Sequence, residues 1–426
     1  MNGRQGYRDA KGDVGFNHAR SLPIYAAPPW HSVGSPPVIR LAQITLREIL
    51  LPLIEPFRSA SGEIAERRIL LLEISDSDGA VAWSECVAQS LPTYSPDTVD
   101  TCWIALSQWL LPRALGVEFA DPAAAHPALD RDVRGHRMAL AAVEMGVWAM
   151  AATKAGLPLA TLLARSSAVA RERGSAPKPL VETGVAIGLQ STPDMLVQRA
   201  QRALDSGYRR IRIKIEPGRD VAWISATRDA LGPEARIAAD ANCSYVMDDP
   251  RHMRALEALD GLGLTMIEQP LAHDDLRRHA ALQQRLVTPI CLDESITSLA
   301  SIEDMLALGS GRMVNLKPGR VGGLQHSLEI HDACARAGVP VWCGGMLESG
   351  IGRAYNVALA SLPNFTEPGD LSPSARYWAR DVVSPEWTMD RDGLVQVPLT
   401  EPGLGIVVNT GMIDDLTVRS ATFRAR

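Results

Sequence analysis

A repeat of strand-like and helix-like segments, which begins near residue 180, constrains the fold more than any other feature of the chain. Short apolar runs typical of buried parallel strands alternate with amphipathic segments that end at a glycine, the residue that supplies the left-handed helix cap. The apolar runs are 182–188, 210–215, 236–240, 265–268, 290–293, 313–317 and 339–343. The clearest helices expected between them are 194–206, 222–231, 301–308 and 324–337. Seven consecutive units, most of them about 25 residues long, favour a TIM-type parallel barrel over a doubly wound sheet, since no GxGxxG fingerprint opens the first helix.

The chain before this repeat is organised differently. Residues 39–51 alternate between apolar and polar side chains, and residues 68–75 and 80–86 flank an Asp-Gly pair, as in a hairpin. Two helices are expected after these strands, at about 97–115 and 138–155. Strands followed by helices predict a small α+β unit.

These patterns predict an α/β protein with a capping domain before its barrel. We expect an α+β capping domain over residues 39–165 and the barrel, with the catalytic site, over residues 180–384. Residues 1–38 are rich in Gly, Pro, Ser, Arg and His without periodicity. They are expected to be a flexible leader, or to result from a start codon assigned too early.

Composition disfavours several classes of partner. The formal net charge is -6, so the basic surface of a nucleic-acid-binding protein is not expected. No segment has the roughly 20 apolar residues of a membrane span, and no signal-peptide pattern opens the chain. Six cysteines are scattered without a CxxC pair, which is typical of reduced thiols. We therefore expect a cytoplasmic protein that acts on a small molecule, without nucleic-acid or membrane partners.

Charged residues stand at the carboxyl ends of the predicted barrel strands, where the loops of such barrels carry their chemistry. They are Lys214, Asp240, Glu268, Asp293 and Lys317. From Asp240 onward, successive members are 28, 25 and 24 residues apart, which is about one strand-helix unit each. We therefore expect their side chains to converge at one level of the barrel mouth.

Three of these residues form a candidate metal site. Asp240, Glu268 and Asp293 offer only oxygen ligands, which suit Mg²⁺, or Mn²⁺ in its place, and disfavour zinc or copper. Lys214 and Lys317 flank them along the chain, as two bases for a carbon acid would. A divalent ion bound to a substrate carboxylate would stabilise the enediolate and bring proton removal within reach of a lysine.

Together with these positions, several longer motifs resemble the enolase superfamily, muconate-lactonising subgroup, and within it the o-succinylbenzoate synthase and N-succinylamino acid (N-acylamino acid) racemase family. The motifs are PFRSASG at 56–62, WSECVAQSLPTYSP at 83–96, KIEPG at 214–218, DAN at 240–242, IEQP at 267–270, LDES at 292–295, NLKPGRVGG at 315–323 and WCGGMLESGIGRA at 342–354. The resemblance implies a modified (β/α)7β barrel and a capping domain completed by about residues 385–426. It also implies Asp240, Glu268 and Asp293 as Mg²⁺ ligands, with Lys214 and Lys317 as acid and base on opposite faces of the substrate.

Further residues are candidates for substrate binding or tuning. Ser59 and Asn242 lie within two of the motifs, and Arg320 follows the second lysine by three positions, as in members that resemble the racemase branch. Arg212 stands where the subgroup normally has the first lysine of a Lys-x-Lys pair. It is expected to keep a positive charge beside Lys214.

Two further departures from the family's pattern look structural. Ala149 follows Trp148 where the family has a Trp-Asp pair, and Tyr355 replaces the usual histidine after the Gly-Arg-Ala motif.

The leading functional hypothesis is a Mg²⁺-dependent N-succinylamino acid or N-acylamino acid racemase, which exchanges the α-proton through an enediolate. The close alternative is o-succinylbenzoate synthase, a dehydration in menaquinone biosynthesis, and one site can serve both reactions. Dipeptide epimerase is disfavoured because Met346-Leu347-Glu348 replaces an Asp-x-Asp pair, and a histidine base is disfavoured because Lys317 holds its place. A Schiff-base lyase or a non-catalytic binding protein would not need all five charged residues at the predicted strand ends. We expect a carboxylate substrate and a homo-oligomer, whose size the sequence leaves open.

Overall fold

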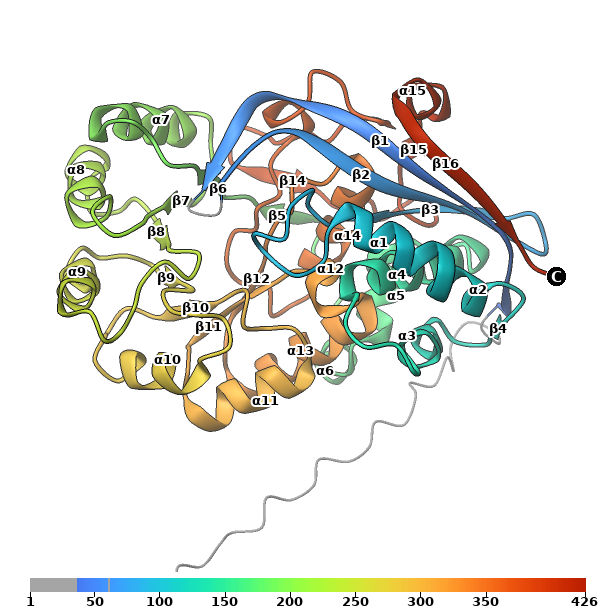
Figure 1. Ribbon diagram of the computed structural model, residues 1–426, viewed down its shortest axis with the longest axis horizontal. Coiled ribbons are helices and arrows are strands. Elements are labelled where there is room, and N and C mark those ends of the chain that lie inside the picture. The colour runs from blue at the N-terminus through green and yellow to red at the C-terminus, as the bar shows by residue number, and fades with distance from the viewer. Residues whose placement is uncertain (1–36, 60–61) are drawn as a thin grey trace, which may run out of the picture.

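Two sheets organise the chain, one parallel and one antiparallel (Figure 1). The computed structural model describes residues 37–59 and 62–426, so residues 1–36 of the predicted leader lie outside the described part of the chain. All six cysteines are free thiols. Among the described residues, no helix has the length and apolar character needed to cross a membrane.

The parallel sheet has seven strands in the order in which they occur along the chain. They are β6 (Val185–Ile187), β7 (Ile211–Lys214), β8 (Ile237–Asp240), β9 (Ile267–Glu268), β10 (Ile290–Leu292), β11 (Met313–Leu316) and β12 (Val341–Cys343). Each strand lies inside one of the seven predicted runs, and every residue in these strands is buried, as expected for a sheet covered by helices.

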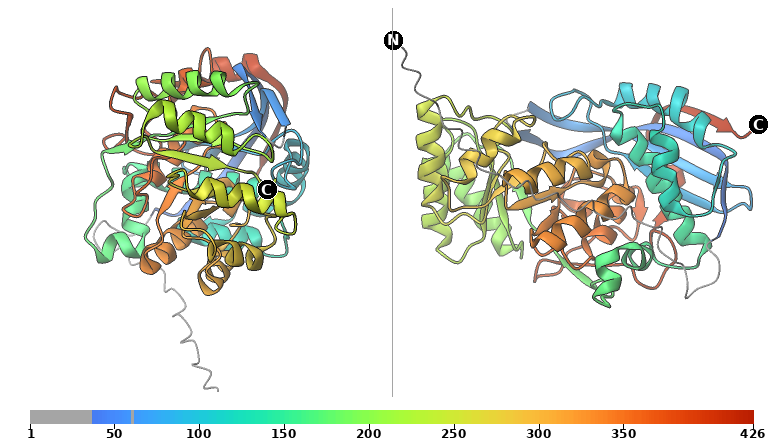
Figure 2. Two further views of the ribbon diagram at one scale, coloured as in Figure 1. Left: turned by 90° about the vertical axis from the view of Figure 1, so that its left-hand side faces the viewer. Right: turned by 90° about the horizontal axis from the view of Figure 1, so that it is seen from below.

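Helices surround this sheet on its outer side (Figures 1 and 2). They are α7 (Pro193–Asp205), α8 (Val221–Leu231), α9 (Pro250–Asp260), α10 (Leu276–Gln283), α11 (Leu299–Leu308), α12 (Pro318–Val321), α13 (Leu324–Ala337) and α14 (Gly350–Ala360). Gly309 and Gly338 end α11 and α13 in the left-handed conformation, at φ of 71° and 69°. These glycines are therefore the caps that the sequence predicts.

Residues 364–370 occupy the eighth position around the barrel without forming a regular strand. Phe365 forms a parallel bridge with Val341 of β12, and Gly369 forms one with Thr183, just before β6. This segment joins the first and last strands of the sheet. The predicted fold class, a modified (β/α)7β barrel with an N-terminal capping unit, is confirmed.

The antiparallel sheet has the order β16-β1-β2-β3, and β4 pairs with β1. Its strands are β1 (Ile39–Ser59), β2 (Gly62–Asp76), β3 (Val81–Cys86), β4 (Glu118–Phe119) and β16 (Thr417–Arg424). The C-terminal β16 lies against β1, with Gln43 opposite Arg424. β1 is longer than the predicted strand, because its far end pairs again with β2 after an irregularity between Pro52 and Phe57.

The helix predicted near residue 97 is divided into α1 (Val99–Ile104), a π-helical segment (Ala105–Leu110) and α2 (Leu111–Ala114), whereas the second is the continuous α4 (Arg137–Lys154). Residues 138–152 of α4 are all buried, so this helix forms the centre of the N-terminal core. The remaining elements are η2 (Pro122–Ala124), α3 (Ala125–Asp130), α5 (Leu159–Ser166), α6 (Ala168–Glu172), β5 (Leu180–Glu182), η3 (Ser374–Arg376), β13 (Val383–Ser384), β14 (Leu394–Gln396), β15 (Val407–Val408) and α15 (Thr410–Leu416).

Two buried glutamates join the N-terminal unit to barrel helices. Glu144 of α4 accepts hydrogen bonds from the amides of Leu324 and Gln325 at the start of α13, at 2.7 and 2.8 Å. Glu85 of β3 accepts one from the Gly352 amide in the first turn of α14, at 3.0 Å. Each carboxylate therefore meets the positive end of a helix, where free amides point outward.

Candidate active site

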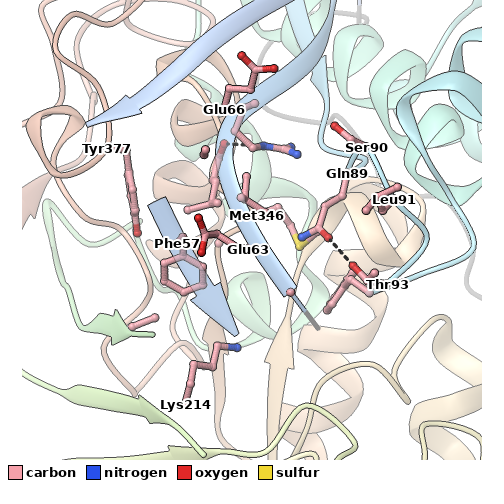
Figure 3. Close-up of a pocket in the computed structure, with 18 of the residues that line it drawn as sticks. Phe57, Glu63, Glu66, Gln89, Ser90, Leu91, Thr93, Lys214, Met346 and Tyr377 are labelled. Carbon is pink, nitrogen blue, oxygen red and sulfur yellow. Dashed lines mark hydrogen bonds between the residues drawn. The ribbon is translucent and has the colours of Figure 1, made fainter. Parts of the chain in front are cut away.

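A cavity of about 470 Å³ lies between the barrel mouth and the far end of the β1–β2 ribbon. The barrel contributes Lys214, Lys317 and Asn242 to its lining, and the ribbon contributes Phe57 and Ile64. Figure 3 shows Lys214 and Phe57 on the same cavity. The N-terminal unit therefore covers the ends of the strands that carry the predicted site.

Neighbouring strands bring the first predicted residues together. Lys214 is opposite Asp240 in the register of β7 and β8, and Asp240 is opposite Glu268 in that of β8 and β9. The Lys214 Nζ lies 2.6 Å from the Asp240 Oδ2 and 2.6 Å from the Asn242 Oδ1. Asn242 has a positive φ of 42° and donates to Glu294. It therefore connects Lys214 to a further buried carboxylate that the sequence analysis did not single out.

Asp293 and Lys317 meet on the other side of the mouth. Glu268 on β9 pairs with Cys291 on β10. Asp293 therefore lies two residues beyond the position opposite Glu268, as expected from the stagger of strands in a barrel. Asp293 accepts from the Lys317 Nζ at 2.9 Å and from the Tyr94 hydroxyl at 3.0 Å. Arg320 also pairs with Asp293 and donates to the Tyr94 hydroxyl at 2.9 Å.

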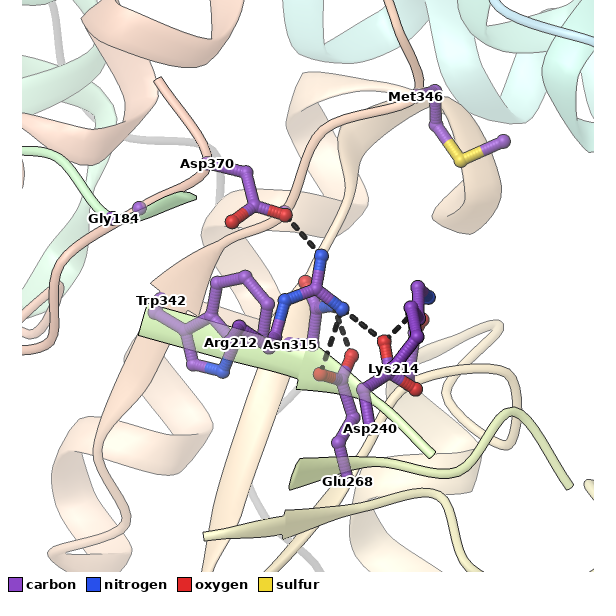
Figure 4. Close-up of polar contacts among 12 residues, drawn as sticks. Gly184, Arg212, Lys214, Asp240, Glu268, Asn315, Trp342, Met346 and Asp370 are labelled. Carbon is purple, nitrogen blue, oxygen red and sulfur yellow. Dashed lines mark hydrogen bonds and ion pairs between the residues drawn. The ribbon is translucent and has the colours of Figure 1, made fainter. Parts of the chain in front are cut away.

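Arg212 lies between two of the predicted metal ligands (Figure 4). Its Nη1 donates to Asp240 and, at 3.0 Å, to the Glu268 Oε2, while its Nη2 donates to Asp370. The guanidinium carbon lies 5.1 Å from the centre of the Trp342 ring. Arg212 is therefore directly bonded to the carboxylates, rather than merely adjacent to Lys214.

The electrostatics follow from burial among many charges. Burial alone would raise the pKa of Asp240, but the charges of Lys214 and Arg212 outweigh it and hold that pKa below its ordinary value. Burial raises the pKa of Glu268 despite the nearby Arg212. Burial would lower the pKa of Lys317, but the neighbouring Tyr94, Glu268 and Glu294 raise it. The two lysines therefore lie in an ion-pair network rather than in an apolar pocket.

The donor set of the three carboxylates suits a hard divalent cation, since it is buried and consists only of oxygen. In the part of the chain that the structure describes, no three His, Cys, Asp or Glu side chains are grouped as metal ligands. Cationic side chains pair with Asp240, Glu268 and Asp293 instead. The Glu294 Oε2, also buried, has no hydrogen-bond partner. The residues therefore fit a divalent ion chemically, while Arg212 pairs with Asp240 and Glu268 in this structure.

The remaining predicted positions lie in different surroundings. Ser59 is the last residue of β1, and its side chain lies outside the described part of the structure. Of the two further departures from the family pattern, Ala149 is buried in α4, and Tyr355 is fully buried and donates to the Trp83 carbonyl. Neither residue lines the cavity of the candidate site.

Several residues of the network were not among the predicted site residues. Tyr94 stands in a quoted motif, but its contact with Lys317 depends on a loop 223 residues away along the chain. Asp370 lies in the irregular closing segment, which has no strand pattern. Asn315, next to a predicted strand end, donates to the Glu268 Oε1 at 2.7 Å. Only Asn315 offered a local signal, because alternate residues of a barrel strand point inward.

Comparisons with known proteins identify the family to which this chain belongs. Residues 42–164 match the mandelate racemase / muconate lactonizing enzyme N-terminal domain, and residues 195–412 match the enolase C-terminal domain-like family. An o-succinylbenzoate synthase of Geobacillus kaustophilus is 43% identical over 379 residues, which cover 89% of this chain and 96% of that protein. An N-succinylamino acid racemase of an Amycolatopsis species is 41% identical over 379 residues, covering 89% and 98%.

A solved structure of an enolase-superfamily member from Listeria innocua has a TM-score of 0.84 and 34% identity, and the match covers 91% of this chain and all of that one. Family membership implies an enzyme with a divalent metal ion and a small-molecule substrate. The chain belongs to the enolase superfamily, muconate-lactonising subgroup, in the family of o-succinylbenzoate synthases and N-succinylamino acid racemases.

Proposed function

We propose that the protein is a Mg²⁺-dependent racemase of N-succinylamino acids or other N-acylamino acids. The observation that carries this proposal is that Lys214 and Lys317 line one cavity from separate barrel strands, each paired with a different carboxylate. Inversion at a carbon needs a proton donor on one face and an acceptor on the other. Two lysines that approach one space from different strands can supply both.

The side chains have distinct roles in this proposal. Asp240, Glu268 and Asp293 would hold Mg²⁺, or Mn²⁺ in its place. The ion, when bound, supplies positive charge against the substrate carboxylate and makes the neighbouring C–H more acidic. Lys214 removes the α-proton of one enantiomer and Lys317 that of the other, and the opposite lysine returns a proton to the other face of the resulting enediolate.

Further groups orient the two lysines and enclose the cavity. Asn242 holds the Lys214 ammonium, and Tyr94 bonds to Lys317 at 3.1 Å. Arg320 bonds to Tyr94 and thereby positions the second lysine. Phe57 and Ile64 supply apolar surface on the ribbon side, where they help to exclude water.

The test is racemisation of an N-succinylamino acid, followed by polarimetry. Activity is expected to disappear after treatment with EDTA and to return with Mg²⁺ or Mn²⁺ but not with Zn²⁺ alone, because the ligands are hard oxygens. Full activity after exhaustive chelation would contradict the mechanism.

A second candidate, o-succinylbenzoate synthase, is supported by the relatives of that name at up to 43% identity. Dehydration starts with the same proton removal, so the same site can catalyse it. The ratio of kcat/KM for the two substrates distinguishes a racemase, a synthase and a bifunctional enzyme.

We also propose a capping domain of residues 39–165 and 385–426 and a catalytic barrel of residues 180–384. Cytoplasmic location and a homo-oligomeric state stay predictions, the latter to be checked by light scattering on the purified protein.

A further inference from the structure

Arg212 occupies carboxylate oxygens that a divalent ion would need. The residue is 4% exposed, and its Nη1 bonds to both Asp240 and Glu268. The Arg212 Nη1 and the Lys214 Nζ both donate to the Asp240 Oδ2, so a metal ion that binds this oxygen competes with these cations. The site therefore needs an alternative position for the guanidinium when the ion binds.

Asp370 has the groups to provide that position. It already accepts from the Arg212 Nη2, but its Oδ1 is buried without a hydrogen-bond partner. On the arginine, the Nε is likewise buried without a partner. Nε and Nη2 form the edge of a guanidinium that binds a carboxylate through two parallel hydrogen bonds. The unused donor and the unused acceptor therefore belong to the same pair of side chains.

The surroundings restrict both partners. The Asp370 amide donates to the Cys343 carbonyl at 2.8 Å, which anchors the backbone next to β12. The Trp342 ring lies 5.1 Å from the Arg212 guanidinium and 4.0 Å from that of Arg210. Arg210 is fully buried, and its Nη2 lies 3.9 Å from the Asp370 Oδ1 without a hydrogen bond. The Arg212 guanidinium therefore lies within hydrogen-bond reach of both Asp370 and the barrel carboxylates (Figure 4).

We propose that Arg212 and Asp370 form an exchange pair that sets the affinity of the site for its divalent ion. In one arrangement, Arg212 bridges Asp240, Glu268 and Asp370, as the structure shows. In the other, its Nε and Nη2 bind both oxygens of Asp370, and its Nη1 leaves Asp240 and Glu268 free for the ion. This inference rests on the ligand assignment in the proposed function.

The experiment measures Mn²⁺ binding to the full-length protein without substrate, by electron paramagnetic resonance of the free ion and by calorimetry. Asp370→Asn is expected to raise the Kd about tenfold, because Arg212 loses its alternative ionic partner. Arg212→Met is expected to lower the Kd about tenfold, because the competing cation is gone. In the Arg212→Met background, Asp370→Asn should change the Kd by less than about twofold.

The double variant separates the exchange mechanism from a simple loss of the Asp370 charge. Loss of that charge alone would weaken metal binding both in the presence and in the absence of Arg212. Glu144→Gln, a matched change of a buried carboxylate away from the cavity, should leave the Kd unchanged. If Asp370→Asn does not fold, Arg212→Met alone decides, since an unchanged or higher Kd overturns the proposal. Absence of Mn²⁺ binding by the unmodified protein would overturn the ligand assignment as well, whereas binding that is insensitive to Asp370 would overturn only the exchange pair.

Discussion

Buried carboxylates occur in two regions of this molecule, and their surroundings differ. At the barrel mouth, Asp240, Glu268 and Asp293 face the side-chain cations of Arg212, Lys214, Lys317 and Arg320. At the junction with the N-terminal unit, Glu144 accepts hydrogen bonds from two helix amides and the Trp148 indole. Both kinds of site are buried, but the carboxylates at the barrel mouth pair with charged side chains, whereas Glu144 pairs with neutral donors.

The pKa values of the carboxylates reflect this difference. Burial raises the pKa of Glu144 to about 8, although the helix amides and Trp148 act against it. Asp240 shows the opposite shift, because full charges nearby outweigh the same burial. Charged neighbours therefore lower the pKa of Asp240, whereas burial prevails at Glu144 and also at Glu268, whose pKa is raised. The Glu144 carboxylate also lies close to the backbone of residue 323. This explains why residue 323 is a glycine, since a Cβ there would lie 2.1 Å from the Glu144 Oε2.

The largest effect is expected at the barrel mouth. Lys214→Ala and Lys317→Ala should each reduce racemisation by at least about 10³-fold, since inversion needs both proton-transfer groups. Each variant should still exchange the α-proton of one enantiomer with D₂O, as NMR would show. Lys154→Ala is the matched control, because Lys154 pairs with Asp78 at 2.6 Å outside the cavity. A single-lysine variant that racemises at the unmodified rate would refute the assignment.

The second prediction concerns the pH dependence of stability at the junction. The pKa of Glu144 is about 8 in the folded protein against an ordinary 4.5, so folding favours the protonated form. Its contribution is fully present below about pH 4.5 and is lost as the pH rises through 8, on the order of 5 kcal/mol. Glu144→Gln should flatten the dependence of the unfolding free energy on pH between 5 and 8.5, measured with urea. An identical slope in the variant would show that Glu144 is ionised throughout this range.

A smaller effect is expected for the cation that touches both Asp293 and Tyr94. Arg320→Gln should lower the racemase kcat/KM about tenfold, because Tyr94 loses one of the partners that orient it toward Lys317. The synthase reaction should lose less, since it needs only one base. The kcat/KM values for both substrates should be measured on the same protein preparation. Equal losses of kcat/KM would mean that Arg320 only supports general binding or folding.

The smallest effect is expected from Arg212→Lys, which keeps a cation beside Lys214. Lysine lacks the planar fork of arginine but carries the same charge, so racemase kcat/KM at saturating Mg²⁺ should stay within about threefold. A loss of more than tenfold would show that the shape of the guanidinium, and not only its charge, is needed for catalysis.

Local patterns were sufficient for much of the fold. The seven parallel strands and the glycine-ended helices could be predicted because strand burial and helix termination depend on neighbours in the chain. The same local spacing placed Lys214, Asp240 and Glu268 at strand ends, and the structure brings them into one register. Their catalytic and metal-binding roles stay proposals.

Periodicity within about 25 residues predicts the succession of strand-helix units and the charged residues at their ends. Tertiary packing, in contrast, places residues 364–370 in the eighth barrel position, brings Tyr94 to Lys317 and joins Arg212 to Asp370, 158 residues away. These contacts join segments that are far apart in the sequence and are not related by the repeat of strand-helix units. They depend on how the closed barrel and the N-terminal sheet pack, since burial leaves each charge only the partners that packing brings within reach.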